Sequence, residues 1–136
     1  MGVISTDNNE IKLYYNSENS LGKQTHAYVE SSDKKILAID ISKTKVTGTQ
    51  WTELAKNLGI EIDELISKEH PDFIQNYGED VNMEEDDWLK VLDKMPIVLT
   101  YPIAIIGKKY VMLKGPADFV KYMESDSANI DDKKHI

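Results

Sequence analysis

Two short apolar runs with one helical segment between them constrain the fold of this chain more than any other feature. Residues 11–15 have the composition of a β-strand and lead into 16–20, a stretch rich in turn-forming residues. Residues 35–41 form a mostly apolar run, which is typical of a strand covered on both faces in a parallel pairing. Between the runs, side chains recur at helical spacing and predict a helix over about 21–31. These elements together predict a βαβ unit with a right-handed crossover.

The middle of the chain carries the start and stop signals of several helices. Thr47 with Gln50, and Asn82 with Glu85, have the spacing of capping boxes, and apolar stripes follow both pairs. Gly59 ends the first of these helices. The other helical segments that we expect in this region are 63–68, 73–77 and 83–94.

The last structured part predicts a β-hairpin followed by a helix. Two β runs, 103–106 and 110–113, flank a turn at 107–109 that contains Gly107, and an apolar helical pattern follows over 119–123. The element order is therefore βαβ, a helical insert, then ββα. This order predicts an α/β fold with a four-stranded mixed sheet and helices packed on its faces.

Length and composition indicate one domain. The 136 residues are 40% hydrophobic, which is enough for a sizeable core, and we expect Trp51 and Trp88 to lie in it. We assign residues 1–9 to a leader, 10–124 to the domain and 125–136 to a polar tail. The sequence has no bilayer-spanning apolar segment and no signal-peptide pattern, so we expect a cytoplasmic protein.

Charge and cysteine content exclude several classes of function. The chain holds 16 Lys and Arg against 24 Asp and Glu, a net charge of −8, which argues against nucleic-acid and membrane-surface partners. Cysteine is absent, so disulfides, thiolate metal sites and thiol reactions of the chain itself are excluded. The three histidines are scattered and the acidic residues lack calcium-loop spacing, so we expect no metal site.

Most of the negative charge is concentrated in the helical insert. Residues 61–93 hold 12 Asp and Glu against two Lys, a local charge of −10. Such an asymmetry could attract a basic surface of a protein partner. The alternative is an ordinary solvated face, because residues 84–87 also lie where a helix N-terminus favours negative charge.

Several segments, taken in their order and spacing, carry a likeness to a known family. They are 14–16 with 20–23, 40–44 with 48–51, 65–68, the acidic stretch before Trp88, and 94–103. From about residue 11 to 123 the chain resembles the arsenate reductase (ArsC) and Spx branch of the thioredoxin-like superfamily. The resemblance implies a thioredoxin-like fold.

The same resemblance implies that the family's chemistry is missing. Its reductases place a nucleophilic Cys at the start of the first helix, where this chain has Asn19, and an amide cannot take over that reaction. The family's oxyanion-binding arginines correspond to Ser67, Tyr101 and a position at or near Gly115. We therefore expect no catalytic residue in this chain.

The loop before the first helix is the main candidate site. We expect Asn16, Asn19, Ser20, Gly22 and Lys23 to form a degenerate active-site loop that could bind a small anion or another ligand. The alternative is a plain strand-to-helix turn with Ser20 as the N-cap.

A second candidate region follows the helical insert. Tyr101-Pro102 resembles the proline that faces the active loop in thioredoxin folds, and we expect a cis peptide bond there. Its role would be fold geometry, or presentation of Tyr101 to an extended partner.

Three functional hypotheses remain open. The first is a non-catalytic protein without a cofactor that binds a protein partner or small anion, through the acidic insert or the degenerate loop. The second is a glutathione-linked arsenate reductase whose thiol is supplied in trans. The third is a Spx-like module that contacts RNA polymerase. The sequence leaves the oligomeric state open.

Overall fold

The structure, a computed structural model, describes residues 10–32 and 34–122. The expected leader (1–9) and polar tail (125–136) lie outside the described residues, as do His135 and the end of the predicted last helix. No described helix is long and apolar enough to cross a membrane.

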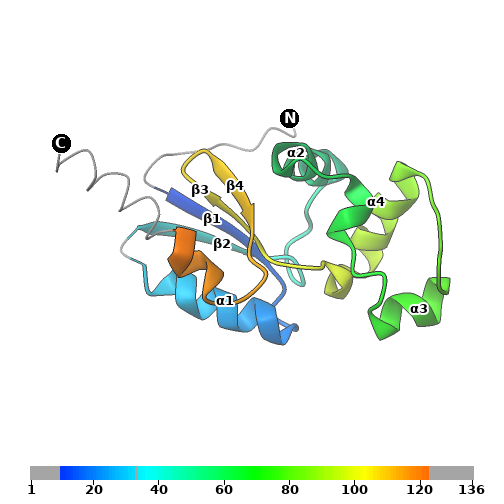
Figure 1. The fold of residues 1–136 in the computed structure, drawn as a ribbon, viewed down its shortest axis with the longest axis horizontal. Helices are drawn as coiled ribbons and strands as arrows, with labels where there is room; N and C mark the ends of the chain where they lie inside the picture. Colours follow the sequence, from blue (N-terminus) through cyan, green and yellow to red (C-terminus); the bar gives the residue numbers. More distant parts are fainter. Residues whose placement is uncertain (1–9, 33, 123–136) are drawn as a thin grey trace.

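A four-stranded mixed sheet forms the centre of the fold (Figure 1), and the expected α/β class is confirmed. Its order is β2-β1-β3-β4; β1 pairs with β2 in parallel, and the other two pairings are antiparallel. The helix α1 (Ser20–Glu30) joins the two parallel strands, as the βαβ prediction requires. The strands are β1 (Glu10–Tyr15), β2 (Lys35–Asp40), β3 (Ile103–Ile106) and β4 (Lys109–Met112).

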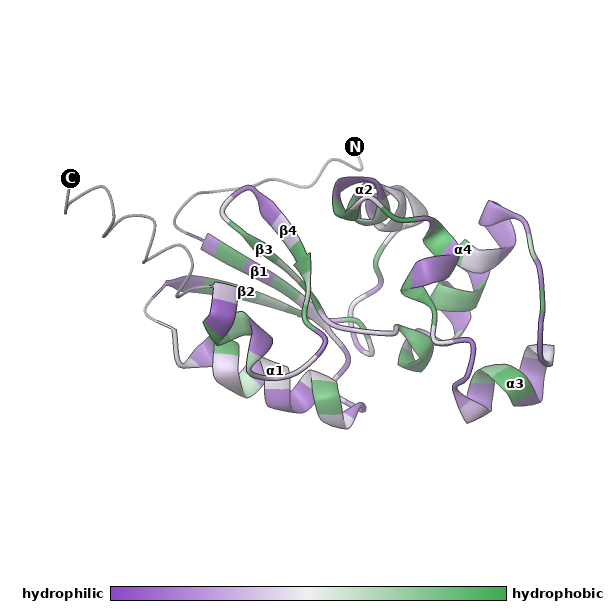
Figure 2. Ribbon diagram, in the orientation of Figure 1, coloured by the Kyte–Doolittle hydropathy of each residue, from purple (hydrophilic) through white to green (hydrophobic). Residues whose placement is uncertain are grey.

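Each face of the sheet supports its own apolar core. Figure 2 shows the hydrophobic residues that run along the strands. Ile11 and Leu13 point to the face that α1 and the helical turn at 118–122 cover. Tyr14 and Ile103 point to the other face, where the helical insert packs. The insert comprises α2 (Gly48–Leu58), η1 (Ile62–Leu65), α3 (Pro71–Tyr77), α4 (Glu85–Lys94) and η2 (Pro96–Val98). Trp51 and Trp88 are both buried in this second core, as expected.

The helix boundaries confirm one predicted cap and correct another. Thr47 and Gln50 form both hydrogen bonds of a capping box, and Gly59 ends α2 with a φ of 75°. The predicted Asn82 cap is wrong, because α4 begins at Glu85 with Glu84 as its N-cap and without a capping side chain. The acidic residues of its first turn stabilise this helix start electrostatically instead.

The second strand is less covered than its apolar sequence predicts. β2 lies at the edge of the sheet, and 44% of Leu37 is exposed. Ile36 and Ala38 pack toward α1, whereas Leu37 points to the other face of the sheet. On that face α2 contacts β4, which lies at the opposite edge of the sheet from β2. The expectation of a strand covered on both faces is therefore wrong, because the insert packs against Ile39 but leaves Leu37 exposed.

Candidate functional site

The candidate site lies at the carboxyl ends of β1 and β2, the edge at which open α/β sheets bind their ligands. The parallel register pairs Tyr15 with Asp40 at this edge. Because β3 runs antiparallel with Tyr14 opposite Ile103, the segment preceding β3, Tyr101-Pro102, meets the same edge. The structure thus brings both predicted site regions to one end of the sheet.

Asn16 is a buried anchor of the loop. Its side chain is only 4% exposed, and its Oδ1 accepts a hydrogen bond from the Glu18 amide at 2.8 Å. Its carbonyl oxygen accepts from the Asn19 amide at 3.1 Å. The Asn16 Nδ2 is buried and has no hydrogen-bond partner among the described residues. Asn16 therefore holds the loop from inside and offers little surface to a ligand.

Asn19, where the resemblance places the nucleophile of the reductases, is the N-cap of α1. Its backbone is extended (φ −108°, ψ 133°), and its Oδ1 accepts from the Gly22 amide at 3.1 Å. Its carbonyl accepts the first helical bond, from the Lys23 amide at 3.0 Å. The alternative that made Ser20 the cap is wrong, because Ser20 is already the first helical residue. The side chain of Asn19 is thus committed to the helix start.

Gly22 lets α1 approach the loop closely. A Cβ atom at this position would lie 2.2 Å from the Asn16 carbonyl oxygen, a distance that requires the backbone to shift. Lys23, one residue on, is exposed. The five predicted loop residues therefore come together as a compact, internally bonded turn.

Asp40 is the centre of a polar cluster that the sequence analysis missed. Its Oδ1 accepts from the Ser17 amide at 3.1 Å, the Ser42 amide at 3.1 Å and the Ser42 hydroxyl at 2.7 Å. The two serine hydroxyls lie 3.2 Å apart. Partial burial pulls the pKa of Asp40 upward, but the hydrogen bonds outweigh it and lower the pKa from 3.8 to about 2. A carboxylate thus binds the loop to the end of β2.

The signal for this cluster was present in the sequence. Asp40 stands at the carboxyl end of a predicted parallel strand, which is where functional polar groups gather in such folds. Its partner Ser17 could not be chosen in advance, because the contact spans 23 residues and depends on the strand register.

The Tyr101–Pro102 peptide is trans, so the expected cis bond is wrong. The trans isomer is the default for X-Pro bonds, and the aromatic residue before Pro102 shifts that preference only weakly. Pro102 is buried and its carbonyl accepts from the Leu113 amide at 2.9 Å. Tyr101 is partly exposed, and the Lys114 ammonium lies 6.0 Å from its ring centroid.

The positions at which the resemblance implies the family's arginines gather little cationic charge. The Ser67 amide donates to the Val98 carbonyl at 2.8 Å, so this segment lies beside the one leading to Tyr101. Lys68, next to Ser67, turns to Asp63 and to the Trp88 ring. Lys114, which precedes Gly115, lies near Tyr101 and was not singled out from sequence.

The described histidines have structural partners. His26 stacks on Tyr15 with ring centroids 4.4 Å apart, and its Nε2 lies 3.0 Å from Glu30. His70 is the N-cap of α3, because its Nδ1 accepts from the Asp72 amide. Within residues 10–32 and 34–122, no three His, Asp or Glu side chains gather as a metal site would require.

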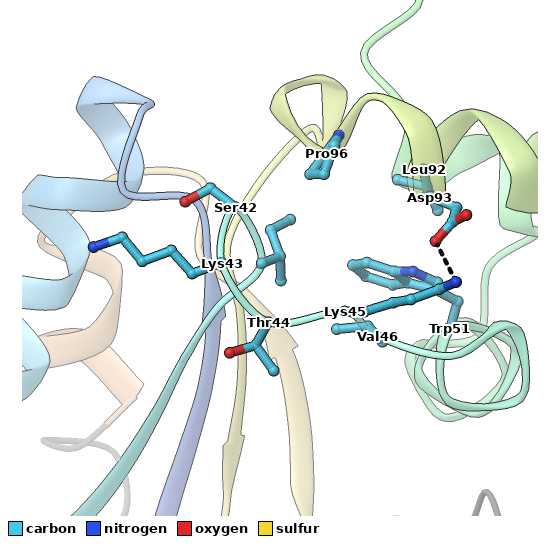
Figure 3. Close-up of a pocket in the computed structure, with 10 residues that line it drawn as sticks. Ser42, Lys43, Thr44, Lys45, Val46, Trp51, Leu92, Asp93 and Pro96 are labelled. Atoms are coloured by element: carbon cyan, nitrogen blue, oxygen red, sulfur yellow. Dashed lines mark ion pairs between the residues drawn. The ribbon is translucent and has the colours of Figure 1, made fainter.

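A separate pocket of about 210 Å³ opens between the loop after β2 and the end of α4. In Figure 3, Lys45 reaches across this opening to Asp93, and Lys43 points away from it. The Lys45–Asp93 ion pair measures 3.4 Å and lies at an exposed position. Trp51 and Leu92 form part of the apolar wall. Of the two lysines that line the pocket, Lys45 is paired with Asp93 and Lys43 points away, so neither cation is directed into the opening.

Comparison with known proteins identifies the fold. A scan against protein-family models and a search of curated proteins return no match. The arsenate reductase from Vibrio cholerae aligns over 82% of this chain and 96% of its own, with a TM-score of 0.69 and 16% identity. A Yersinia pestis protein, provisionally named an arsenate reductase, aligns over 82% and 98%, with a TM-score of 0.70 and 19% identity.

These likenesses establish the fold class. The chain has the thioredoxin-like fold of the arsenate reductase (ArsC) structures, and the resemblance expected from its segments is confirmed at the level of the fold. At identities below 20%, the reaction of those proteins does not transfer with the fold.

Proposed function

We propose that this chain is a non-catalytic binding protein built on an arsenate reductase-type thioredoxin fold, and that its ligand is another protein. The observation that carries the proposal is Asn19. It stands where the resemblance places the nucleophile, it caps α1 with its side chain, and the chain contains no cysteine to replace it. We also propose that the protein acts in the cytoplasm, as expected from the sequence.

The polar groups of the loop do not fit a small anion or the carboxylates of glutathione. The Gly22 amide is bonded to Asn19, and the Ser17 and Ser42 donors are bonded to Asp40. The carboxylate of Asp40 is ionised above a pH of about 2 and repels an oxyanion brought to this edge. An anion that used these donors would have to break existing hydrogen bonds and approach a like charge.

The acidic insert supports a protein ligand with a basic surface. Of the 12 acidic side chains in 61–93, only Asp63 and Asp93 form ion pairs in the described part of the chain. A hollow of about 170 Å³ is bordered by Glu61, Asp63 and Glu85, and Trp88 lies in its wall. Carboxylates around an apolar wall suit the alkyl stem and charged head of a Lys or Arg.

The test of non-catalysis is turnover. The purified chain is incubated with arsenate, glutathione and glutaredoxin, and arsenite release is compared with a reaction lacking the chain and with an active arsenate reductase. We expect release at the rate of the reaction without the chain. Release above that rate would support the second hypothesis, a reductase that borrows its thiol from glutathione, and would overturn the proposal.

The test of the protein ligand is capture at two salt concentrations. We expect a partner with a basic surface to be retained at low salt and released at high salt, because exposed charge pairs are screened. Glu85→Lys, at the hollow, should weaken capture, whereas Glu18→Lys, an exposed control in the loop, should not. Weaker capture by Glu18→Lys, with capture by Glu85→Lys unchanged, would place the contact at the degenerate loop instead of the acidic insert.

A further inference from the structure

The outer edge of β2 has the composition of a covered strand. Residues 36–39 are all apolar, yet no described strand pairs with this edge and 44% of Leu37 is exposed. Natural edge strands usually carry charges or irregularities that prevent pairing with another chain. The opposite edge follows that rule, since β4 is short and begins at Lys109 after Lys108. β2 has its charges only at its ends.

The parallel register determines which backbone groups face outward. The Ile41 amide donates a hydrogen bond to the Tyr15 carbonyl, so the backbone groups of Ile41 face β1. Backbone groups alternate in direction along a strand, and Leu37 and Ile39 therefore also direct theirs toward β1. The amide and carbonyl groups of the alternate residues, Ile36 and Ala38, therefore point away from β1. The Asp40 carbonyl is already occupied, because the amides of the following turn, at 43 and 44, donate to it.

We propose that β2 pairs with the β2 strand of a second copy of this chain, in antiparallel orientation with the twofold axis at Leu37. In this register Ile36 faces Ala38 of the other copy, and each such pair exchanges both backbone hydrogen bonds. This register uses the outward amide and carbonyl groups of both Ile36 and Ala38. It does not need the Asp40 carbonyl, which already accepts hydrogen bonds from the following turn. A shift by two residues toward the end of the strand would require that carbonyl.

The same register places complementary side chains opposite one another. Leu37 meets Leu37 of the other copy on the open face, which buries the exposed side chain. Lys34, which immediately precedes β2, stands opposite Asp40 of the other copy in this register. The acidic insert lies at the far end of the molecule from β2 (Figure 1), so the two most negative regions remain apart in the dimer.

Cross-linking tests the register directly, because the chain has no cysteine of its own. Residues that face each other without hydrogen bonds in an antiparallel pair have Cα atoms about 4.5 Å apart, which a disulfide can span. With oxidised glutathione as the oxidant, Leu37→Cys should form a covalent dimer at least tenfold faster than Tyr28→Cys. Tyr28 is the matched control, since it is also 44% exposed but lies on α1. Equal rates would overturn the proposal.

Light scattering after size-exclusion chromatography tests the free interface. We expect the full chain to shift from monomer to dimer as its concentration rises, and Leu37→Lys to remain monomeric because two like charges would meet at the axis. Ala38→Pro should also remain monomeric; it removes an outward amide and leaves the bonds to β1 intact. Tyr28→Lys should dimerise like the unmodified chain.

Thermal unfolding followed by circular dichroism is the control that tests whether each variant is folded. A chain that stays monomeric at every concentration would overturn the proposal. So would a dimer that persists in both folded edge variants, since it would be formed by another surface.

Discussion

At the scale of single residues, the loop differs from a reactive site in how its polar groups are used. Asn19 and Asp40 each accept hydrogen bonds that hold backbone in place, and the helix start has a side-chain cap. A reactive site needs donors left available for the charge that develops on the substrate. Here the Gly22, Ser17 and Ser42 donors stabilise the fold instead.

The N-cap assignment predicts an asymmetry between neighbouring residues. Asn19→Ala should lower the free energy of unfolding by about 1 kcal/mol, because the Gly22 amide loses its acceptor. Ser20→Ala should change it by less than about 0.5 kcal/mol, since Ser20 is exposed and already helical. Urea unfolding at neutral pH measures both values. A larger loss for Ser20→Ala would mean that the wrong residue has been taken as the cap.

The hydrogen bonds of Asp40 predict a pH-dependent contribution to stability. Its folded pKa, about 2, lies below the ordinary 3.8, so its contribution is complete above about 4 and is lost as the pH falls toward 2. Asp40→Asn should therefore cost on the order of 1 kcal/mol at neutral pH, and the difference from the unmodified chain should narrow below pH 4. Thermal melts from pH 7 to pH 2 measure it. A difference that is constant over this range would contradict the assignment.

At the scale of elements, α1 is positioned by contact with the loop more than by its own apolar stripe. Its buried residues are Gly22, Thr25 and Val29, whereas Tyr28, the largest apolar side chain of the helix, is 44% exposed. Gly22 brings the helix against the Asn16 carbonyl. The orientation of α1 therefore depends on the absence of a side chain at this position.

Two glycine substitutions should have opposite effects. Gly22→Ala should destabilise the fold by about 1–3 kcal/mol, because its Cβ would lie 2.2 Å from a backbone oxygen. Gly48→Ala, in the first turn of α2, meets only the Leu89 side chain at 3.6 Å and should stabilise by about 0.4–1 kcal/mol. Denaturant midpoints of the two variants measure these changes. Equal effects would show that the close approach of α1 is not needed.

Sequence patterns predicted the helices and strands better than they predicted the burial of those elements and the contacts between them. The mixed sheet, the Thr47–Gln50 capping box and the two core tryptophans followed from local spacing. The exposure of Leu37 and the cluster around Asp40 depend on strand order and on contacts between distant residues, which a local pattern does not contain. The expected cis bond at Pro102 came from the resemblance and from the aromatic residue before the proline, and the trans bond shows the limit of that inference.

At the scale of the whole molecule, the sheet and the helical insert share one core. Tyr14 and Ile103 of the sheet belong to the same buried cluster as Trp51, Phe73 and Trp88 of the insert. A shared core couples the stability of the two parts, whereas separate cores allow one to unfold first.

The shared core predicts a single unfolding transition. In urea, tryptophan fluorescence, which reports on Trp51 and Trp88 of the insert, should change together with the far-ultraviolet circular dichroism of the whole chain. Coincident midpoints are the expected result. An earlier fluorescence transition would show that the insert unfolds independently of the sheet.

The loop before α1 is held by hydrogen bonds within itself, and we propose that it does not receive an oxyanion. The most direct measurement is a titration of the isotope-labelled chain with arsenate, followed by the backbone amide resonances of residues 17–23 in solution NMR. We predict that these resonances do not shift beyond the change that matched ionic strength causes. Saturable shifts at the Ser20, Leu21 and Gly22 amides would contradict the account, because they would show an oxyanion bound at the start of α1.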